Sequence, residues 1–446
     1  MQKYNTYKSS NVEWLGDVPS HWKVTRLINR TVQIVGGDWG DDPELESDEH
    51  VLLPVIRVQD IENEYEIGDE KLTYRKIKAS KIDHRLIDNK TLLIEKSGGG
   101  EKQLVGRVAI PKKITMPAIC SNFMEKIEMD EQAVPSFFNY IFHALYYRNM
   151  NFPFVQQTTG IQNLKSTYYF YTKVAYPNPT EQTAIAAYLD QATANIDKVI
   201  ATKQKQLEKL EQYKQSKIHE CVTKGLNSDV TLKPSGIDWI GEVPSHWKVW
   251  RLKDEAEYIL TGSTPSTSNS EYYDNGTIKW FAPGSFNGEV SLDDAQKLIN
   301  KKALDDGELK LFPKGCLFLI GIGATIGKVA MIEEDSSCNQ QLNVIKPTVK
   351  LESRYLIYFM KIYEDIIPKI SQFTTLPIFN QTKTGQLNIC IPPKKEQIEI
   401  ANYLDNVSLN IKKEKSIIEQ QIEKLKQYRK CLIHECVTGK RKVIND

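Results

Sequence analysis

The sequence predicts an α+β protein with two similar globular domains, separated by an antiparallel coiled coil of two long helices and related by an internal pseudo-two-fold repeat. Three observations support this fold class. An eleven-residue segment occurs twice, as WLGDVPSHWKV at 14–24 and as WIGEVPSHWKV at 239–249. Each copy precedes a body of mixed strand and helix patterns. Each body precedes a segment without glycine or proline, at 180–224 and 394–438. Two tryptophans, a proline and a histidine in one register indicate a tandem duplication.

Composition narrows the class of protein. The 446 residues leave room for several domains, and 40% hydrophobic with 26% charged residues is ordinary for a globular protein. No apolar run is long enough to span a membrane, and the polar N-terminus lacks the apolar core of a signal peptide, so we expect a cytoplasmic protein with no membrane contact. The net charge of +1 does not by itself indicate a nucleic-acid binder, but it permits a local basic patch.

The seven cysteines form no C-x-x-C pair. Their scattered positions predict reduced, mostly buried thiols and argue against a disulfide framework or a zinc site.

The repeated segment begins each half of the chain. Its Pro-Ser-His-Trp sequence predicts a turn that leads into a strand or short helix at 23–27. The tryptophans either contact the helix of the other repeat or plug the base of their own domain, and both alternatives are open. Because no other ligand lies at metal spacing, we interpret His21 and His246 as structural hydrogen-bonding residues.

The two bodies follow one plan with different residues. In each, short β-like runs alternate with glycine, proline and aspartate clusters, and a helical pattern of large apolar residues follows. In the first body the expected strands are 51–58, 91–95, 104–110 and 123–129, and the expected helix is 135–148. In the second the expected strands are 278–281, 316–320 and 342–345, and the expected helix is 354–367.

Each glycine- and proline-free segment predicts one continuous helix of about 68 Å. A proline precedes each segment and a glycine follows it, as expected at helix ends. The narrow apolar stripe requires a partner helix, and the other copy is the obvious one; the alternative is that each helix docks on its own body. The predicted seam consists of Leu189, Ile196, Val199 and Leu210 in the first helix and Leu404, Ile411, Ile418 and Leu425 in the second.

These patterns divide the chain into five parts. They are a first domain at 1–179, a central long helix at 180–225, a second domain at 226–393, a C-terminal long helix at 394–440 and a tail at 441–446.

No motif indicates catalysis. The glycine-rich run from Gly321 to Lys328 has five residues between Gly321 and Gly327, and valine follows the lysine, so it fails as a phosphate loop and is interpreted as a turn between strands. His219 and His434 recur in Ile-His-Glu-Cys-Val and are interpreted as packing or partner-contact residues. We find no catalytic triad, paired carboxylates or metal-ligand cluster.

The tandem WLG-x-VP-x-HW segments, the two diverged bodies and the two EQ-x-x-I-A-x-YLD…KL-x-QY…I-x-ECVT helices closely resemble the specificity subunit of type I restriction-modification systems. The resemblance extends from about Trp14 to Lys440. It implies that each body is a target-recognition domain and that the coiled coil sets their spacing along double-stranded DNA. Because the two bodies differ, it implies a bipartite, asymmetric DNA site.

The resemblance also implies the partners. The chain itself would be non-catalytic and would bind no cofactor. Two modification subunits would carry S-adenosylmethionine and methylate adenine, and two restriction subunits would use ATP and Mg²⁺.

Base recognition requires arginine or lysine for guanine and asparagine or glutamine for adenine. The candidates Gln162, Asn163, Asn380 and Gln381 are preferred because they are expected in equivalent loops. The acidic segment 38–49 is expected to be a solvated loop that faces away from a polyanion. The candidate DNA-binding residues are Arg57, Gln59, Lys96, Arg107, Gln157, Gln162 and Asn163 in the first body, and Lys279, Ser285, Lys328, Gln340, Gln341, Asn380 and Gln381 in the second.

Two other functions are compatible with the patterns. The first is a structural adaptor with two protein-binding heads on a coiled coil, which would show no sequence-dependent DNA shift. The second is an enzyme with an unfamiliar site, which would methylate DNA as an isolated chain.

Overall fold

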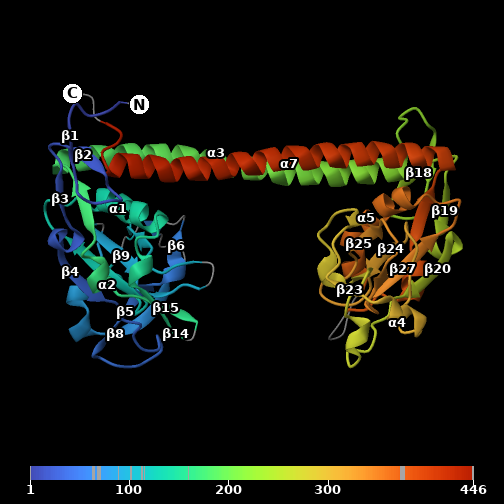
Figure 1. Ribbon diagram of the computed structural model, residues 1–446, viewed down its shortest axis with the longest axis horizontal. Coiled ribbons are helices and arrows are strands. Elements are labelled where there is room, and N and C mark those ends of the chain that lie inside the picture. The colour runs from blue at the N-terminus through green and yellow to red at the C-terminus, as the bar shows by residue number, and fades with distance from the viewer. Residues whose placement is uncertain are drawn as a thin grey trace. The chain divides into compact units, whose positions relative to one another are not determined.

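The computed structural model describes residues 2–62, 66–67, 72–88, 90–100, 103–111, 114, 116–158, 160–371 and 377–443. The chain divides into two compact units. Unit 1 contains Met1–Lys203 and Gln420–Asp446, and unit 2 contains Gln204–Glu419. Each long helix therefore contributes one part to each unit (Figure 1).

Unit 1 is built around a four-stranded sheet. Its central strand β9 is buried along its whole length because both faces are covered. Leu92 and Ile94 pack with helix α1 in one core, and Leu93 packs in a second core with Met124 and Ile56. The four-stranded sheet has the order β11 (Val108–Ala109), β9 (Thr91–Glu95), β13 (Met124–Met129) and β4 (Thr31–Gly36), and α1 spans Pro135–Tyr147.

Smaller sheets complete unit 1. They are β12 (Ile119–Cys120), β5 (His50–Ile56) and β8 (Thr73–Lys78); β10 (Ser97–Gly98), β15 (Ile161–Leu164) and β14 (Val155–Thr158); β1 (Tyr7–Ser9) and β2 (Asp17–Pro19); β3 (Lys23–Arg26) and β16 (Lys173–Tyr176); and β6 (Ile61–Glu62) and β7 (Glu66–Ile67). A short helix α2 spans Ser166–Tyr169.

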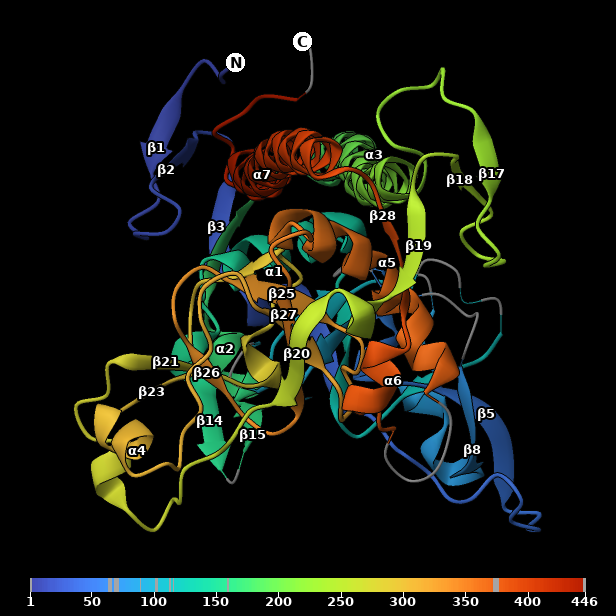
Figure 2. The same cartoon turned by 90° about the vertical axis from the view of Figure 1, so that its right-hand side faces the viewer.

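Unit 2 repeats this strand order and adds a fifth strand. Its larger sheet has the order β20 (Ala256–Thr261), β27 (Leu342–Pro347), β24 (Leu317–Ile320), β25 (Val329–Ile332) and β22 (Ser291–Leu292). The added strand is β22, and strands β20, β27, β24 and β25 correspond to β4, β13, β9 and β11. Helix α5 (Ser353–Ile370) lies against it (Figure 2), and Leu317 and Leu319 share a core with α5. The smaller elements are β23 (Lys297–Ile299), β21 (Ile278–Phe281) and β26 (Ser337–Cys338); β17 (Leu232–Pro234) and β18 (Glu242–Pro244); β19 (Lys248–Arg251) and β28 (Asn388–Ile391); and helices α4 (Lys301–Asp305) and α6 (Gln381–Gly385).

A close backbone approach is also repeated. A Cβ atom on Gly37 would lie 2.2 Å from the Cys120 carbonyl oxygen, and one on Gly262 would lie 2.1 Å from that of Cys338. Glycine is therefore required at both positions, and the two chain segments after Gly37 and Gly262 begin at the same point of the fold.

The predicted strands and helices are largely confirmed. Strand β9 coincides with the predicted 91–95, α5 covers the predicted helix 354–367, and α1 ends one residue before the predicted end of 135–148. The prediction of a strand over 104–110 is too long, because only Val108–Ala109 pairs with β9. The run 321–328 is a turn between β24 and β25, as predicted.

The long helices α3 (Pro179–Lys224) and α7 (Lys394–Val437) pair within each unit. In unit 1, Arg429 forms an ion pair with Asp197 at 3.2 Å, and Lys203 donates to Gln421 at 2.6 Å. The residue number on α3 rises from 197 to 203 while that on α7 falls from 429 to 421, so the two helices run antiparallel in unit 1. In unit 2, Lys415 forms an ion pair with Glu211 at 3.0 Å.

The helices also dock on the bodies. In unit 1 the Tyr140 hydroxyl on α1 donates to Asp190 on α3 at 2.8 Å, and in unit 2 the Tyr358 hydroxyl on α5 donates to Asp405 on α7 at 2.7 Å. The apolar stripe left two alternatives, pairing with the other long helix or docking on the helix's own body. Both are found, because the start of each helix packs on its own body as well as on the other helix.

Seven of the eight predicted seam residues are covered by neighbouring side chains. Val199 is the exception and is 44% exposed, so its assignment to the seam was wrong. The next seam position after Ile196 lies four residues later, not three, and is Ile200, which packs against the core. The covered residues are Leu189, Ile196, Leu404, Ile411 and Ile418, which are buried, and Leu210 and Leu425, which are half-buried.

The repeated segment fastens the helix ends. In unit 1 the Trp22 indole N–H donates to Glu181 on α3 at 3.0 Å, and His21 Nε2 lies 2.9 Å from the same carboxylate. The Trp22 ring also lies beside Gly439, which follows α7. The tryptophan thus plugs its own domain and also contacts the other repeat's helix.

Unit 2 repeats this arrangement. The Trp247 indole N–H donates to Glu396 on α7 at 3.1 Å, and His246 Nε2 lies 2.9 Å from that carboxylate. The Trp247 ring lies beside Gly225, which follows α3. The structural interpretation of both histidines is confirmed.

All seven cysteines are unpaired thiols, and only Cys431 is exposed, which confirms the prediction of mostly buried thiols. Burial raises the pKa of the Cys120 and Cys436 thiols to about 12. Among the described residues, no helix combines the length and the apolar character that crossing a membrane requires.

Candidate nucleic-acid interface

Unit 1 contains a hollow of about 880 Å³ at one end of its four-stranded sheet. Chain segments that are far apart in sequence meet there, because several strands end or begin at this edge. Of the predicted residues, Arg57, Gln59 and Arg107 line it. The full lining is Trp39, Arg57, Val58, Gln59, Glu95, Ser97, Gly98, Gly99, Gly100, Gln103, Arg107, Ser121, Asn122 and Phe123.

Arg107 is held on the wall of the hollow by a buried carboxylate. Its Nε donates to Glu95 Oε2 at 3.0 Å, and the Glu95 side chain is 1% exposed while that of Arg107 is 17% exposed. Burial raises the pKa of Glu95, while the hydrogen bond and the positive charge of Arg107 act in the opposite direction. The carboxylate thus fixes one edge of the guanidinium.

Two more cations of unit 1 are paired in the same way. Arg57 precedes a 3-10 turn, Val58–Asp60, and its Nη2 and Nε donate to the Asp60 carboxylate at 2.8 and 3.2 Å. Lys96 Nζ lies 2.9 Å from the buried Glu125 carboxylate. Paired cations keep a defined direction, as bidentate recognition of a base edge requires.

Gln162 holds the glycine loop of the hollow. Its amide oxygen accepts from the Val105 N–H at 3.2 Å, and its amide nitrogen donates to the Gly100 carbonyl at 3.1 Å. The side chain is buried, with its amide used at both ends. The prediction that Gln162 contacts a base is therefore corrected, since it supports the loop.

The other predicted amides of unit 1 are exposed. Gln59 lies beside Arg57 in the hollow, and with its oxygen turned toward Arg57 it accepts from both Nη atoms at 2.9 Å. Asn163 accepts from the Ser97 hydroxyl at 2.7 Å, on the strand that pairs with β10. Gln157 lies on the hairpin strand β14, opposite Gln162.

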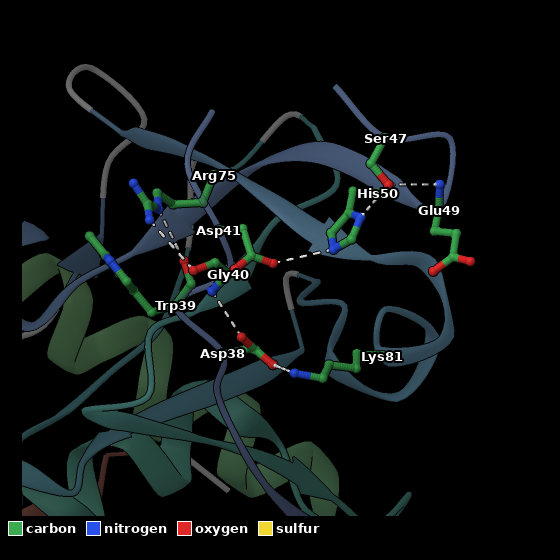
Figure 3. Close-up of polar contacts among 9 residues, drawn as sticks. All are labelled: Asp38, Trp39, Gly40, Asp41, Ser47, Glu49, His50, Arg75 and Lys81. Atoms are coloured by element: carbon green, nitrogen blue, oxygen red, sulfur yellow. Dashed lines mark hydrogen bonds and ion pairs between the residues drawn. The ribbon is translucent and has the colours of Figure 1, made fainter. Parts of the chain in front are cut away.

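The acidic segment 38–49 borders the hollow through Trp39. Arg75 covers the Trp39 ring at 5.0 Å from its centroid (Figure 3). Asp38 accepts from Lys81 at 2.6 Å and from the Gly40 N–H at 2.8 Å. Burial acts to raise the pKa of Asp38, but these hydrogen bonds and the charge of Lys81 outweigh it and lower the pKa overall.

His50 follows the segment directly; its Nε2 lies 3.2 Å from Asp41, and its Nδ1 lies 2.9 Å from the Ser47 hydroxyl (Figure 3). Most of the segment is solvated, as expected. Trp39, near the start of the segment, lines the hollow, and the expectation that the segment faces away from a polyanion stays a prediction.

Unit 2 presents amides and hydroxyls at the corresponding place. Gln340 is exposed and accepts from the Thr264 hydroxyl, and Gln341 accepts from Asn339 at 2.8 Å. Gln381 donates to the Thr261 hydroxyl at 3.1 Å. These side chains are neutral, in contrast to the paired cations of unit 1.

The remaining predicted residues of unit 2 are placed differently. Lys328 is exposed in the turn before β25. The Ser285 hydroxyl caps its own 3-10 turn by accepting from Ala282 N–H at 3.3 Å. Lys279 donates to the Asp293 carbonyl at 2.7 Å and forms an ion pair with Glu334 at 2.5 Å. Asn380 is the N-cap of α6 and accepts from Lys383 N–H at 2.9 Å.

The assumed equivalence of Gln162/Asn163 with Asn380/Gln381 is wrong. Leu164 N–H bonds the Lys96 carbonyl, and at the same place in unit 2 Phe379 N–H bonds the Gly321 carbonyl. Asn380 therefore corresponds to Lys165, which precedes α2. The sequence comparison was displaced by three residues because the intervening loops differ.

Most residues of the unit 1 hollow were not among the sequence candidates, and three residues that the candidates missed shape the site most directly. Glu95 and Asp60 position arginines, and Trp39 forms part of the wall. An acid at the end of the apolar run TLLIE was the available signal for Glu95, since a charge there requires a partner. Among the described residues, no group of histidine, cysteine and acidic side chains is arranged to hold a metal ion.

Comparison with known proteins shows the family. A family model described as "Type I restriction modification DNA specificity domain" matches the chain twice, at 23–212 and 244–424. The MjaIX specificity subunit of Methanocaldococcus jannaschii is 33% identical over 188 residues, which are 41% of this chain and 43% of that protein. The putative MjaX specificity subunit of the same organism is 24% identical over 450 residues, or 98% of each chain.

Solved structures share the fold. A chain from a structure of a type I R-M system covers 94% of this chain and 98% of its own length, with a TM-score of 0.72 and 16% identity. The HsdS subunit of Thermoanaerobacter tengcongensis covers 97% and 100%, with a TM-score of 0.56 and 16% identity. The duplicated sheets, the two matched domains and these relatives lead to one conclusion: the chain belongs to the family of type I restriction-modification DNA specificity subunits.

Proposed function

We propose that this chain is a non-catalytic subunit that reads a bipartite, asymmetric DNA site for a type I restriction-modification complex. Each unit reads one half of the site, and the paired helices α3 and α7 act as a coiled-coil spacer. The observation that carries the proposal is the combination of one repeated sheet order with two different sets of loop side chains.

The loops support different readers on one scaffold. Unit 1 places Arg57 and Arg107 in a hollow, and arginine is the commonest partner of guanine. Unit 2 places Gln340 and Gln341 after β26, where unit 1 has Asn122 and Phe123 after β12, and amides pair with adenine. Loops that carry different side chains on the same sheet order fit a site whose two halves have different sequences.

The helices support a spacer of fixed length. Helix α3 spans 46 residues without interruption, which corresponds to about 69 Å at 1.5 Å per residue. Two turns of B-DNA extend about 70 Å. Pairing along an apolar seam stiffens both helices, so two readers fixed at its ends would recognise half-sites at one separation only.

The partners follow from the family and from the low charge. We propose that two modification subunits and two restriction subunits assemble on the chain, and that S-adenosylmethionine, ATP and Mg²⁺ bind those subunits. A net charge of +1 is compatible with DNA binding if the partners supply many of the phosphate contacts.

The test is methylome sequencing of a host that carries this chain with its cognate modification subunit. The proposal predicts adenine methylation in one motif of two short, unlike halves separated by an unspecified gap. A continuous motif, a palindrome, or no sequence dependence would contradict it.

A further inference from the structure

Arg107 and Lys328 occupy the same position in the two units. Each follows a glycine with a positive φ, 103° at Gly106 and 93° at Gly327, and each precedes a strand at the edge of the recognition loops. The Glu95 N–H donates to the Arg107 carbonyl at 2.8 Å, and the Ile320 N–H donates to the Lys328 carbonyl at 2.8 Å. The two cations are therefore matched by backbone register.

The residue across the strand differs. In unit 1 it is Glu95, a buried carboxylate that binds Arg107 Nε at 3.0 Å. In unit 2 it is Ile320, which is buried in an apolar core. Within the described part of unit 2, Lys328 forms no ion pair and its side chain is exposed. A carboxylate therefore orients Arg107, whereas no carboxylate orients Lys328 within the described part of unit 2.

The same contrast recurs at a second position. Arg57 precedes a 3-10 turn that ends in Asp60, and the corresponding turn of unit 2 is preceded by Ala282 and ends in Ser285. A third cation, Lys96, is anchored by buried Glu125. Unit 1 thus orients three cations with carboxylates, of which Glu95 and Glu125 are buried and Asp60 is partly buried.

Aiming matters for bases more than for phosphates. A phosphate attracts a positive charge from many directions, whereas guanine O6 and N7 accept two parallel hydrogen bonds from one guanidinium. Arg107 lines the hollow with its Nε on Glu95, and Gln103, with its amide oxygen turned toward Arg107, accepts from Nε at 2.6 Å and from Nη1 at 3.0 Å, so the guanidinium is held in one orientation on the wall. An exposed lysine on a flexible stem has the properties of a phosphate contact.

We propose that Arg107, positioned by Glu95, determines a guanine in the half-site of unit 1, and that Lys328 at the matched position contacts phosphate without specifying a base. This inference rests on the proposed function, because it assumes that unit 1 reads DNA. Glu95 is a positioning residue in this scheme.

The experiment uses the chain assembled with its modification subunits and a library of DNA substrates randomised in both half-sites. Arg107→Lys keeps the positive charge beside Glu95 and removes the planar guanidinium, with its two parallel N–H donors. We expect one G·C position of the unit 1 half-site to lose about 5- to 100-fold in preference, while the other half-site stays unchanged. Glu95→Gln keeps Arg107 but weakens its anchor, so we expect a smaller loss at the same position.

Lys328→Ala is the matched control. We expect methylation of all sequences to weaken by one factor, with a smaller dependence on salt and no change in base preference. Three results for Arg107→Lys would overturn the inference: a uniform loss, a change at an A·T position, or a change in the other half-site. Glu95→Gln decides the matter if Arg107→Lys fails to assemble, since an unaltered base preference in Glu95→Gln would also overturn it. In each case the wild-type assembly still reports a bipartite motif, so the proposed function is judged separately.

Discussion

Glu181 shows how much a single residue of the repeat can organise. Its carboxylate accepts from the Trp22 indole at 3.0 Å and from the Tyr4 hydroxyl at 2.7 Å, and it lies 2.9 Å from His21. Glu396 takes the corresponding place in unit 2. The identical WxxxVPSHW register is explained by this requirement, because the tryptophan must reach a helix start that lies far away in sequence.

Glu181→Gln tests this arrangement. The amide keeps one acceptor oxygen and turns an NH₂ group toward groups that donate, so buried hydrogen bonds are lost and we expect destabilisation by about 1–3 kcal/mol. The measurement is the urea midpoint of unfolding. Glu208→Gln, on the exposed face of the same helix, should leave the midpoint unchanged. Equal effects of the two substitutions would contradict the organising role of Glu181.

At the scale of elements, the sequence predicted what periodicity and helix-breaking residues encode. Strand β9, helix α1 and both long helices were recognisable, because burial on one or both faces imposes a repeat on the residues. Val199 was misassigned because a three-residue and a four-residue step from Ile196 both reach an apolar residue, and only the partner helix decides between them. In the proposed function, the length of the paired helices sets the gap between the two half-sites.

A seven-residue insertion tests the spacer. Seven residues restore the faces of a helix to within about 20°, so one heptad placed after Lys203 and another before Gln420 should preserve the seam. The two insertion sites lie opposite each other in the helix pair, since Lys203 donates a hydrogen bond to Gln421. The insertion lengthens the helices by about 10 Å, and we expect the unspecified gap to grow by about three base pairs. Methylome sequencing measures the gap.

An insertion in one helix alone is the control. It displaces one apolar face against the other, and we expect methylation to be lost. An unchanged gap after the paired insertion would show that the helices do not set the spacing.

At the scale of the whole molecule, the duplication was readable from the sequence, but the set of residues that meet in the hollow of unit 1 was not. The hollow of unit 1 takes side chains from segments near Trp39, Arg57, Glu95, Arg107 and Phe123, and only strand register brings them together. Residue type alone selected Gln162, which the structure uses to hold a loop. Residue type also overlooked Glu95, because the search for base-contacting residues considered cations and amides, and the role of this acid depends on its partner Arg107.

The most direct measurement of the central claim is the methylome of a chain whose residues 26–175 are replaced by the equivalent body of another family member. If each unit reads one half-site independently, one half of the methylated motif changes while the other half and the gap remain. Replacing residues 251–390 should change the complementary half. If either exchange alters both halves, or neither, the division of recognition between the two units is contradicted.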